Sequence, residues 1–173
     1  MPLRYERIFL IAIAAIVLAL DQVTKAWIVQ NLAPGQSREL AEWLTPILSL
    51  TYVTNTGVAF GLFQGLGDVL MVVALLTIAL ILAFSRSFPP GQWLLYFAMG
   101  LQLGGAMGNL TDRILRGAVV DFIDLNFWPL HHWPIFNIAD TSIVVGVGLV
   151  LLTIWRENRK EHRDGNCDVR LRA

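Results

Sequence analysis

Charged residues are scarce in this sequence. Asp, Glu, Lys and Arg together make up 15 % of the 173 residues, whereas a soluble domain carries roughly a quarter. The charges sum to zero, so nothing in the composition indicates nucleic-acid binding. The single cysteine, Cys167, excludes an internal disulfide. Hydrophobic residues reach 55 % of the chain, and they gather in long apolar runs.

Motifs of several common hydrolases are also missing. The chain has no His-Glu-x-x-His motif, and its adjacent His131 and His132 do not have the spacing of zinc ligands on a helix. It has no Gly-x-Ser-x-Gly motif, and no serine flanks Lys25 for a serine–lysine pair. We therefore expect neither a metal nor a cofactor.

Four segments are apolar enough to cross a membrane. They cover about residues 8–28, 69–86, 93–113 and 137–155. The first run is followed by Asp21-Gln-Val-Thr-Lys25 and not by a small-residue cleavage site, so it predicts a retained span and not a signal peptide. The sequence thus predicts a single integral membrane domain over residues 1–173, an all-α membrane bundle of four transmembrane helices.

Basic residues predict the orientation of the spans. With four spans, the two termini and the short loop 85–92 share one side, and that side holds nine of the 13 lysines and arginines. Basic residues favour the cytoplasmic side. We therefore expect both termini in the cytoplasm, a cytoplasmic tail over 156–173, and outer, periplasmic segments over 29–68 and 114–136.

The first outer segment is too long for a simple connector. Its β-branched stretch from Leu48 to Thr54 predicts a strand, with turns at Pro34-Gly35 and Asn55-Thr-Gly57. Aromatic residues in the second outer segment are typical of the headgroup layer. A small β-containing periplasmic segment on the membrane surface is the prediction.

Polar residues gather at the outer ends of the expected spans. Charge inside a membrane costs about 2.5 to 3.5 kcal/mol per residue on insertion scales, so this clustering needs a reason. Asp21 and Lys25 are four residues apart on one helix face and can form an ion pair. The residues in the cluster are Asp21, Lys25, Asn109, Asp112, Arg113, Asn137 and Asp140. They indicate a site near the outer face.

The third span carries two adjacent rows of residues at helical spacing. One row contains only glycine and predicts close helix packing: Gly100, Gly104 and Gly108. The other row contains Gly105, Asn109 and Arg113 at the membrane edge. Arg113 either anchors the helix end or uses its guanidinium to bind a carbonyl or carboxylate.

Two aspartates flanked by apolar residues, Asp121 and Asp140, are candidate catalytic groups. Either one alone could be an ordinary helix cap or turn residue. If the fold brings them close in a site of low dielectric, they share one proton and supply an acid and a base at the same pH. Such a pair can activate water against an amide. Asp124 competes with Asp121 on spacing alone.

Five motifs in order give a more specific indication. The sequence resembles lipoprotein signal peptidase, the type II signal peptidase of bacteria, in the motifs Asp21-Gln-Val-Thr-Lys25, Asn55-Thr-Gly-Val-Ala-Phe60, Gly104-Gly-Ala-Met-Gly-Asn-Leu-Thr-Asp-Arg113, Val119-Val-Asp-Phe122 and Phe136-Asn-Ile-Ala-Asp140.

The resemblance implies an aspartic endopeptidase of the bacterial cytoplasmic (inner) membrane, without a metal. Its substrate would be a diacylglyceryl-modified prolipoprotein among the membrane lipids, cleaved before the lipidated cysteine, and globomycin would inhibit it. By this likeness Asp121 and Asp140 are the catalytic pair, in preference to Asp124. The likeness also implies that the substrate and inhibitor site is lined by Asn55, Asn109, Arg113 and Asn137, with structural support from Asp21, Lys25 and Gly105.

A small ion- or proton-coupled transporter subunit is the main alternative function. It would use Asp21, Asp112 and Asp140 as a polar path. Such a path should continue toward the cytoplasm, but the inner halves of all four expected spans lack charged residues, apart from Arg86 at the very end of the second. The alternative is therefore the weaker of the two.

Overall fold

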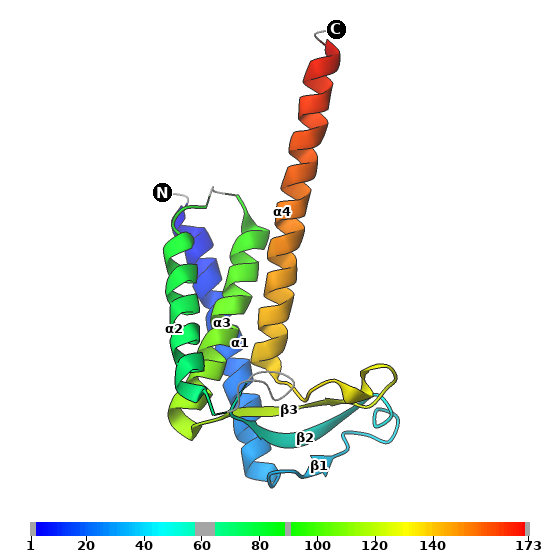
Figure 1. Cartoon of the computed structure of the whole chain (residues 1–173). Helices are drawn as coiled ribbons and strands as arrows, with labels where there is room; N and C mark the ends of the chain where they lie inside the picture. The colour runs from blue at the N-terminus through cyan, green and yellow to red at the C-terminus, as the bar shows by residue number, and fades with distance from the viewer. Residues whose placement is uncertain (1–2, 58–64, 89–90, 172–173) are drawn as a thin grey trace.

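Four helices and a small sheet make up the fold of the computed structural model, which describes residues 3–57, 65–88 and 91–171. The elements are α1 (Leu3–Asn31), β1 (Ser37–Arg38), β2 (Leu48–Asn55), α2 (Gly67–Phe84), α3 (Trp93–Arg116), β3 (Val119–Leu125), the short 3₁₀ helix η2 (Leu130–His132) and α4 (Ile138–Leu171). The helices run side by side, and the sheet lies across one end of the bundle (Figure 1). The termini and the α2–α3 connection lie at the other end.

Helix α3 is the centre of the bundle, since it packs against α1, α2 and α4. Glycine permits this close approach, as the small-residue row predicts. A Cβ atom on Gly104 would lie 2.7 Å from the carbonyl oxygen of Ala14 in α1, and one on Gly146 of α4 would lie 2.7 Å from that of Ala98. Larger side chains at these positions would push the helices apart.

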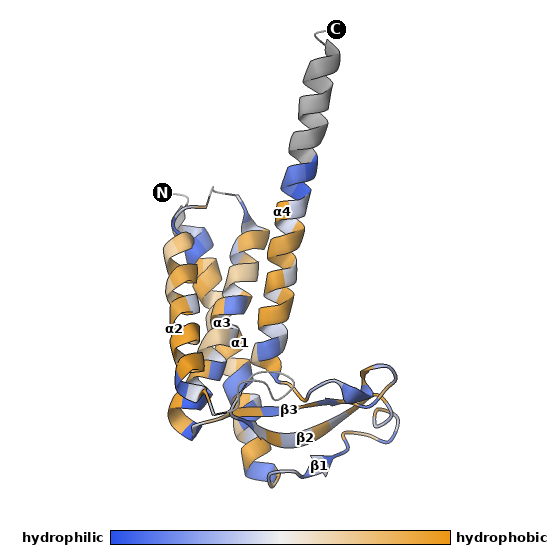
Figure 2. Ribbon diagram, in the orientation of Figure 1, coloured by the Kyte–Doolittle hydropathy of each residue, from blue (hydrophilic) through white to orange (hydrophobic). Residues whose placement is uncertain are grey.

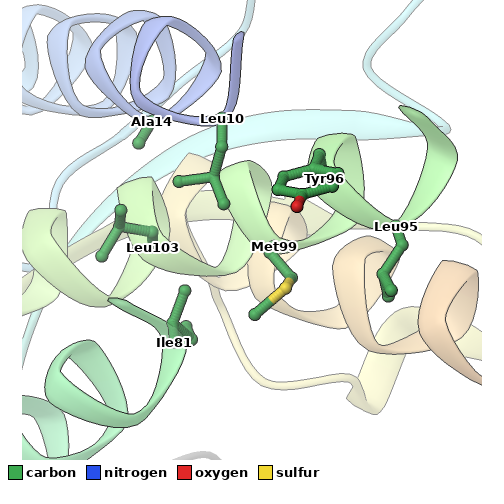
Figure 3. Packing of buried hydrophobic residues seen from close by; sticks show 7 residues of the cluster. All are labelled: Leu10, Ala14, Ile81, Leu95, Tyr96, Met99 and Leu103. Carbon is green, nitrogen blue, oxygen red and sulfur yellow. The ribbon is translucent and has the colours of Figure 1, made fainter. Parts of the chain in front are cut away.

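A hydrophobic cluster holds α1, α2 and α3 together away from the sheet (Figure 3). Tyr96 is fully buried there, and its hydroxyl donates to the carbonyl oxygen of Ser85. The buried members are Leu10, Ala14, Ile81, Leu95, Tyr96, Met99 and Leu103. Close packing of this kind stabilises helix contacts inside a membrane, where lipid offers no hydrophobic driving force.

Among the residues that the structure describes, three helices are long and apolar enough to cross a membrane: Tyr5–Asn31, Gly67–Phe84 and Ile138–Arg159. Many of their large apolar side chains are exposed, as expected where lipid is the solvent. Helix α3 is paler than α2 in the hydropathy colouring of Figure 2, because it carries glycines and polar residues. The mainly helical membrane fold with a small β-containing segment is confirmed, and α3 as a fourth span stays a prediction.

The sheet has the order β1-β2-β3 and is antiparallel throughout. Strand β2 confirms the strand predicted from Leu48 to Thr54. Strand β3 is not predicted from the sequence, which allows only a turn or a helix cap around Asp121. The β2–β3 register pairs Val53 with Asp121 and Ser49 with Asp124. Side chains alternate along a strand, so Asp121 and Asp124, three residues apart, point to opposite faces of the sheet.

One further feature differs from what the sequence predicts. Helix α4 continues to Leu171, well past residue 155, so the polar segment after the apolar run is helical and projects beyond the other helices (Figure 1). Of the Asn55–Phe60 motif, residues 58–60 lie outside the described residues.

Candidate active site

A cavity of about 570 Å³ opens at the sheet end of the bundle. Asp121 from β3 and Asp140 from α4 both line it, together with the predicted site residues Asn55, Asn109 and Arg113. The rest of the lining is mostly apolar and comes largely from α2, α4 and the segment before α4; it includes Leu70, Val73, Val144 and Phe136. The structure therefore brings the two aspartates to one cavity that lies between α2 and α4.

Asp140 lies in the first turn of α4 and is fixed by Asn137. The backbone N–H of Asp140 donates to Asn137 Oδ1 at 2.9 Å, and the backbone N–H of Asn137 donates to Asp140 Oδ2 at 3.3 Å. This reciprocal pair is a capping box, which satisfies two amides at a helix start. The local sequence thus aims Asp140 into the cavity.

Asp121 is 2 % exposed and accepts hydrogen bonds on both carboxylate oxygens. Asn137 Nδ2 donates to Oδ1 at 2.6 Å, and Asn55 Nδ2 donates to Oδ2 at 2.9 Å. Asn137 therefore contacts both aspartates. Its Nδ2 atom donates to the Asp121 carboxylate, and its Oδ1 atom and backbone N–H form the capping box with Asp140. Asp140 receives its own amide bond, from Asn109 Nδ2 to Oδ1 at 2.7 Å.

Each of the three asparagines is oriented by a partner that can only donate. The Oδ1 atom of Asn55 accepts from the N–H of Gly57 at 2.9 Å, and that of Asn137 accepts from Asp140 as described. The Oδ1 atom of Asn109 accepts from Lys25 Nζ at 3.0 Å. With each oxygen held in this way, only the NH₂ groups of the amides can face the carboxylates.

Burial raises the pKa of Asp121 from 3.8 to about 7, and the negative charge of Asp140 acts in the same direction. The hydrogen bonds from Asn55 and Asn137 lower the pKa but only partly offset these effects. Below pH 7 the Asp121 carboxyl therefore keeps its proton. A pair of buried acids in which one member holds a proton can act as acid and base together.

Arg113 reaches the same cavity from the last turns of α3. Its guanidinium donates to the carbonyl oxygens of Gly57 at 3.2 Å and Asn109 at 3.3 Å. Its buried Nε has no hydrogen-bond partner within the described part of the chain. Arg113 thus joins the strand end to α3 and lines the cavity with a positive charge.

Asp124 does not line the cavity. Its Oδ2 accepts a hydrogen bond from Thr51 Oγ1 at 2.7 Å. That bond lies on the sheet face opposite to Asp121. The geometry therefore separates the two acids that spacing alone could not distinguish.

The predicted support residues lie directly behind the aspartates. Asp21 and Lys25 are fully buried, with Lys25 Nζ 2.8 Å from Asp21 Oδ2. A Cβ atom on Gly105 would lie 2.5 Å from the carbonyl oxygen of Ala139, so glycine lets α3 approach the start of α4. Sequence reasoning gave no support role to the fully buried Asp112, which also binds Lys25, at 3.0 Å; a charge inside an apolar span was the available signal.

Solved structures place this fold in a class. The chain resembles two structures described as a bacterial membrane enzyme solved by the in meso method, at 2.3 Å and 1.9 Å resolution. The first has a TM-score of 0.79 at 32 % identity and covers 87 % of this chain and 89 % of its own. The second has a TM-score of 0.74 at 33 % identity and covers 84 % and 92 %. The fold is therefore of the type found in bacterial membrane enzymes.

Sequence comparison names the family. The family model described as Signal peptidase (SPase) II matches residues 13–156. Proteins named lipoprotein signal peptidase include one from Shouchella clausii, 43 % identical over 87 % of this chain and 95 % of the relative, and one from Desulfitobacterium hafniense, 40 % identical over 86 % and 93 %. The chain belongs to the signal peptidase II family, as the five motifs predict.

Proposed function

We propose that this protein is a membrane aspartic endopeptidase that removes signal peptides from diacylglyceryl-modified prolipoproteins and cleaves before the lipidated cysteine. The observation that carries the proposal is the meeting of Asp121 and Asp140 in one cavity, bridged by Asn137. Family membership supports the peptidase activity, because the relatives are named lipoprotein signal peptidases. The transporter alternative has no support among these relatives.

The proposed chemistry divides the two acids by role. Asp140 accepts a proton from water as the water oxygen attacks the scissile carbonyl. The protonated Asp121 donates its proton to the carbonyl oxygen and stabilises the tetrahedral intermediate. The intermediate then collapses: the C–N bond breaks, the leaving nitrogen gains a proton from Asp140, and Asp121 recovers its own. The chain supplies both proton-transfer groups itself, and the proposal includes no metal.

The amides and Arg113 are the proposed substrate-binding groups. The carboxylates are held by Asn55, Asn109 and Asn137. Two of these amides, Asn55 and Asn109, line the cavity together with Arg113, so these three side chains can also bind backbone carbonyls of the peptide. The apolar walls from α2 and α4 suit the lipid chains of the substrate. Globomycin-type inhibitors would occupy the same groove.

The membrane placement completes the proposal. We infer that α3 is a fourth span in the bacterial cytoplasmic membrane, because it is enclosed by three helices of spanning length and composition. Basic residues put both termini in the cytoplasm, so the sheet and the site face outward. A lipid-anchored substrate would then reach the cavity by lateral diffusion among membrane lipids.

The test uses Asp121→Asn, Asp140→Asn and the double variant, which keep size but remove proton transfer. We expect each single change to abolish cleavage of a lipidated prolipoprotein by the purified protein in detergent. The double change should add little, because the two acids act as a unit.

Asp124→Asn is the matched control and should keep most of the activity, since Asp124 lies on the other face of the sheet. Membrane yield and thermal stability are measured for every variant. Near-normal turnover in either Asp121→Asn or Asp140→Asn would refute the aspartic mechanism, whereas loss in Asp124→Asn alone would move the catalytic role to Asp124.

A further inference from the structure

Lys25 belongs to α1, and its side chain, with its ammonium group, has no exposed surface. Its Nζ lies 2.8 Å from Asp21 Oδ2, 3.0 Å from Asp112 Oδ2 and 3.0 Å from Asn109 Oδ1. An ammonium group has three hydrogens, and each has one acceptor here. The charged group is therefore held in one position between α1 and α3.

Both carboxylates bound to Lys25 also hold the backbone beside a catalytic aspartate. Asp112 Oδ2 accepts the N–H of Val120 at 3.0 Å, one residue before Asp121. Asp21 Oδ1 accepts the N–H of Ala139 at 3.0 Å, one residue before Asp140. One cation thus connects the backbone of β3 with the start of α4.

The third acceptor, Asn109, leads to a catalytic side chain. Because its Oδ1 faces Lys25, its NH₂ group faces Asp140 Oδ1 at 2.7 Å. Asn137 Nδ2 also lies 3.2 Å from Asn109 Oδ1. The NH₂ group of Asn137, however, has two hydrogens and three acceptors within reach: Asp121 Oδ1, Asn109 Oδ1 and the carbonyl oxygen of Val120. Asp121 Oδ1 is the nearest of the three. Of the two donors to Asn109 Oδ1, Lys25 is the nearer, at 3.0 Å against 3.2 Å for Asn137.

The charges around Lys25 are balanced. Asp21 and Asp112 are the anions, and Lys25 and Arg116 are the cations, with Arg116 paired to Asp112. Removing one member of a buried pair leaves an uncompensated charge and is strongly destabilising. A single substitution of Lys25 would therefore confuse loss of stability with loss of positioning.

We propose that Lys25 is a positioning residue for catalysis, which fixes the separation of Asp121 and Asp140 and turns the Asn109 amide toward Asp140. This role extends beyond an ion pair within one helix. It rests on the aspartic mechanism proposed above.

The experiment compares Lys25→Met combined with Asp21→Asn against Asp21→Asn alone. The double variant removes one charge of each sign, and the Asp21→Asn change keeps a side-chain oxygen for the Ala139 N–H. The single variant keeps Lys25 on Asp112 and Asn109. We expect the double variant to bind globomycin and to unfold at or above the temperature of the single variant, because the single variant keeps one uncompensated positive charge. Its kcat should fall about tenfold to hundredfold further, the effect of one hydrogen bond to a charged group, with little change in KM.

Adding Asn109→Ala tests whether Lys25 acts through that amide. In the Asp21→Asn background, Lys25→Met and Asn109→Ala together should reduce kcat by less than the product of their separate effects. The positioning role would be overturned if the effects of Lys25→Met and Asn109→Ala on kcat multiplied fully. It would also be overturned if the Lys25→Met, Asp21→Asn variant had the same kcat as Asp21→Asn alone. A loss of kcat that is matched by loss of globomycin binding and of thermal stability would overturn it as well.

Asp121→Asn, assayed in parallel, separates this inference from the proposed function. An active Asp121→Asn variant would refute the aspartic mechanism itself. An inactive Asp121→Asn variant beside a fully active Lys25 variant would refute only the inference.

Discussion

At the scale of single residues, asparagine is what makes two buried carboxylates tolerable at this site. An amide offers both an acceptor and a donor, so Asn137 can cap α4 with its oxygen and still donate to Asp121. Aspartate at position 137 would place a third carboxylate directly beside Asp121 and Asp140. The amides therefore supply hydrogen bonds to the acids without adding charge, and Asp121 keeps a pKa of about 7.

Arg113→Ala tests the proposed binding role of the guanidinium. A hydrogen bond to a charged group is worth about 1.5 to 3 kcal/mol, so KM and the globomycin dissociation constant should rise about tenfold to hundredfold. The proposed catalytic acids Asp121 and Asp140 should stay in place, so kcat should fall less than kcat/KM. Steady-state cleavage and inhibitor titration in detergent measure both quantities.

Arg113→Lys is the matched control for this change, because it keeps the charge and loses the planar guanidinium. We expect it to fall between wild type and Arg113→Ala. Unchanged KM and globomycin affinity in Arg113→Ala would leave Arg113 as a helix-end anchor only.

At the scale of elements, the site depends on how closely α3 approaches α4. Gly105 faces the first turn of α4, where an added Cβ would lie 2.5 Å from the Ala139 carbonyl oxygen and 2.8 Å from a side-chain carbon of Ile143. Backbone cannot move aside as a flexible side chain can. The start of α4, which carries Asp140, would have to shift.

Gly105→Ala should therefore lower both stability and activity. Overpacking costs about 1 to 3 kcal/mol, and displacement of Asp140 should reduce kcat as well. Gly148→Ala, in α4 with no atom within 4 Å of the added Cβ, is the control and should unfold at or above the wild-type temperature. Thermal unfolding and cleavage rate test the pair, and equal behaviour of the two variants would contradict the close-packing explanation.

At the scale of the whole molecule, the bundle has two unlike ends. The sheet and the proposed catalytic cavity occupy one end, and the termini with the α2–α3 connection occupy the other (Figure 1). Helix geometry alone leaves open which end faces the cytoplasm. The distribution of lysine and arginine predicts that the termini are cytoplasmic, since basic residues favour that side of the membrane.

Topology reporters test the assignment. A reporter fused after Ala173 should give a cytoplasmic signal, and one inserted near Gln36, in an exposed turn before β1, should give an outer signal. Each fusion is also assayed for cleavage of a lipidated prolipoprotein, so that a misfolded fusion is recognised. An outer signal after Ala173 from an active fusion would place the site on the wrong side of the membrane for this proposal.

Features that depend on neighbouring residues could be predicted from the sequence alone. Apolar runs predict the four helices, because lipid-exposed segments must be uncharged and must satisfy their backbone internally. The Asn137-to-Asp140 spacing is that of a capping box, which is local to one helix turn. Five motifs in order also indicate the family, because a peptidase site requires those residue types together.

Contacts between residues far apart in the sequence became known only from the folded structure. Strand β3 exists because it pairs with β2, about 70 residues earlier, and its short apolar sequence reads equally well as a membrane-edge turn. The contacts of Asp121 with Asn55 and of Lys25 with Asn109 join residues 66 and 84 positions apart. No local pattern encodes such contacts, so the face of Asp121 and the support from Asp112 emerged only when helices and sheet packed together.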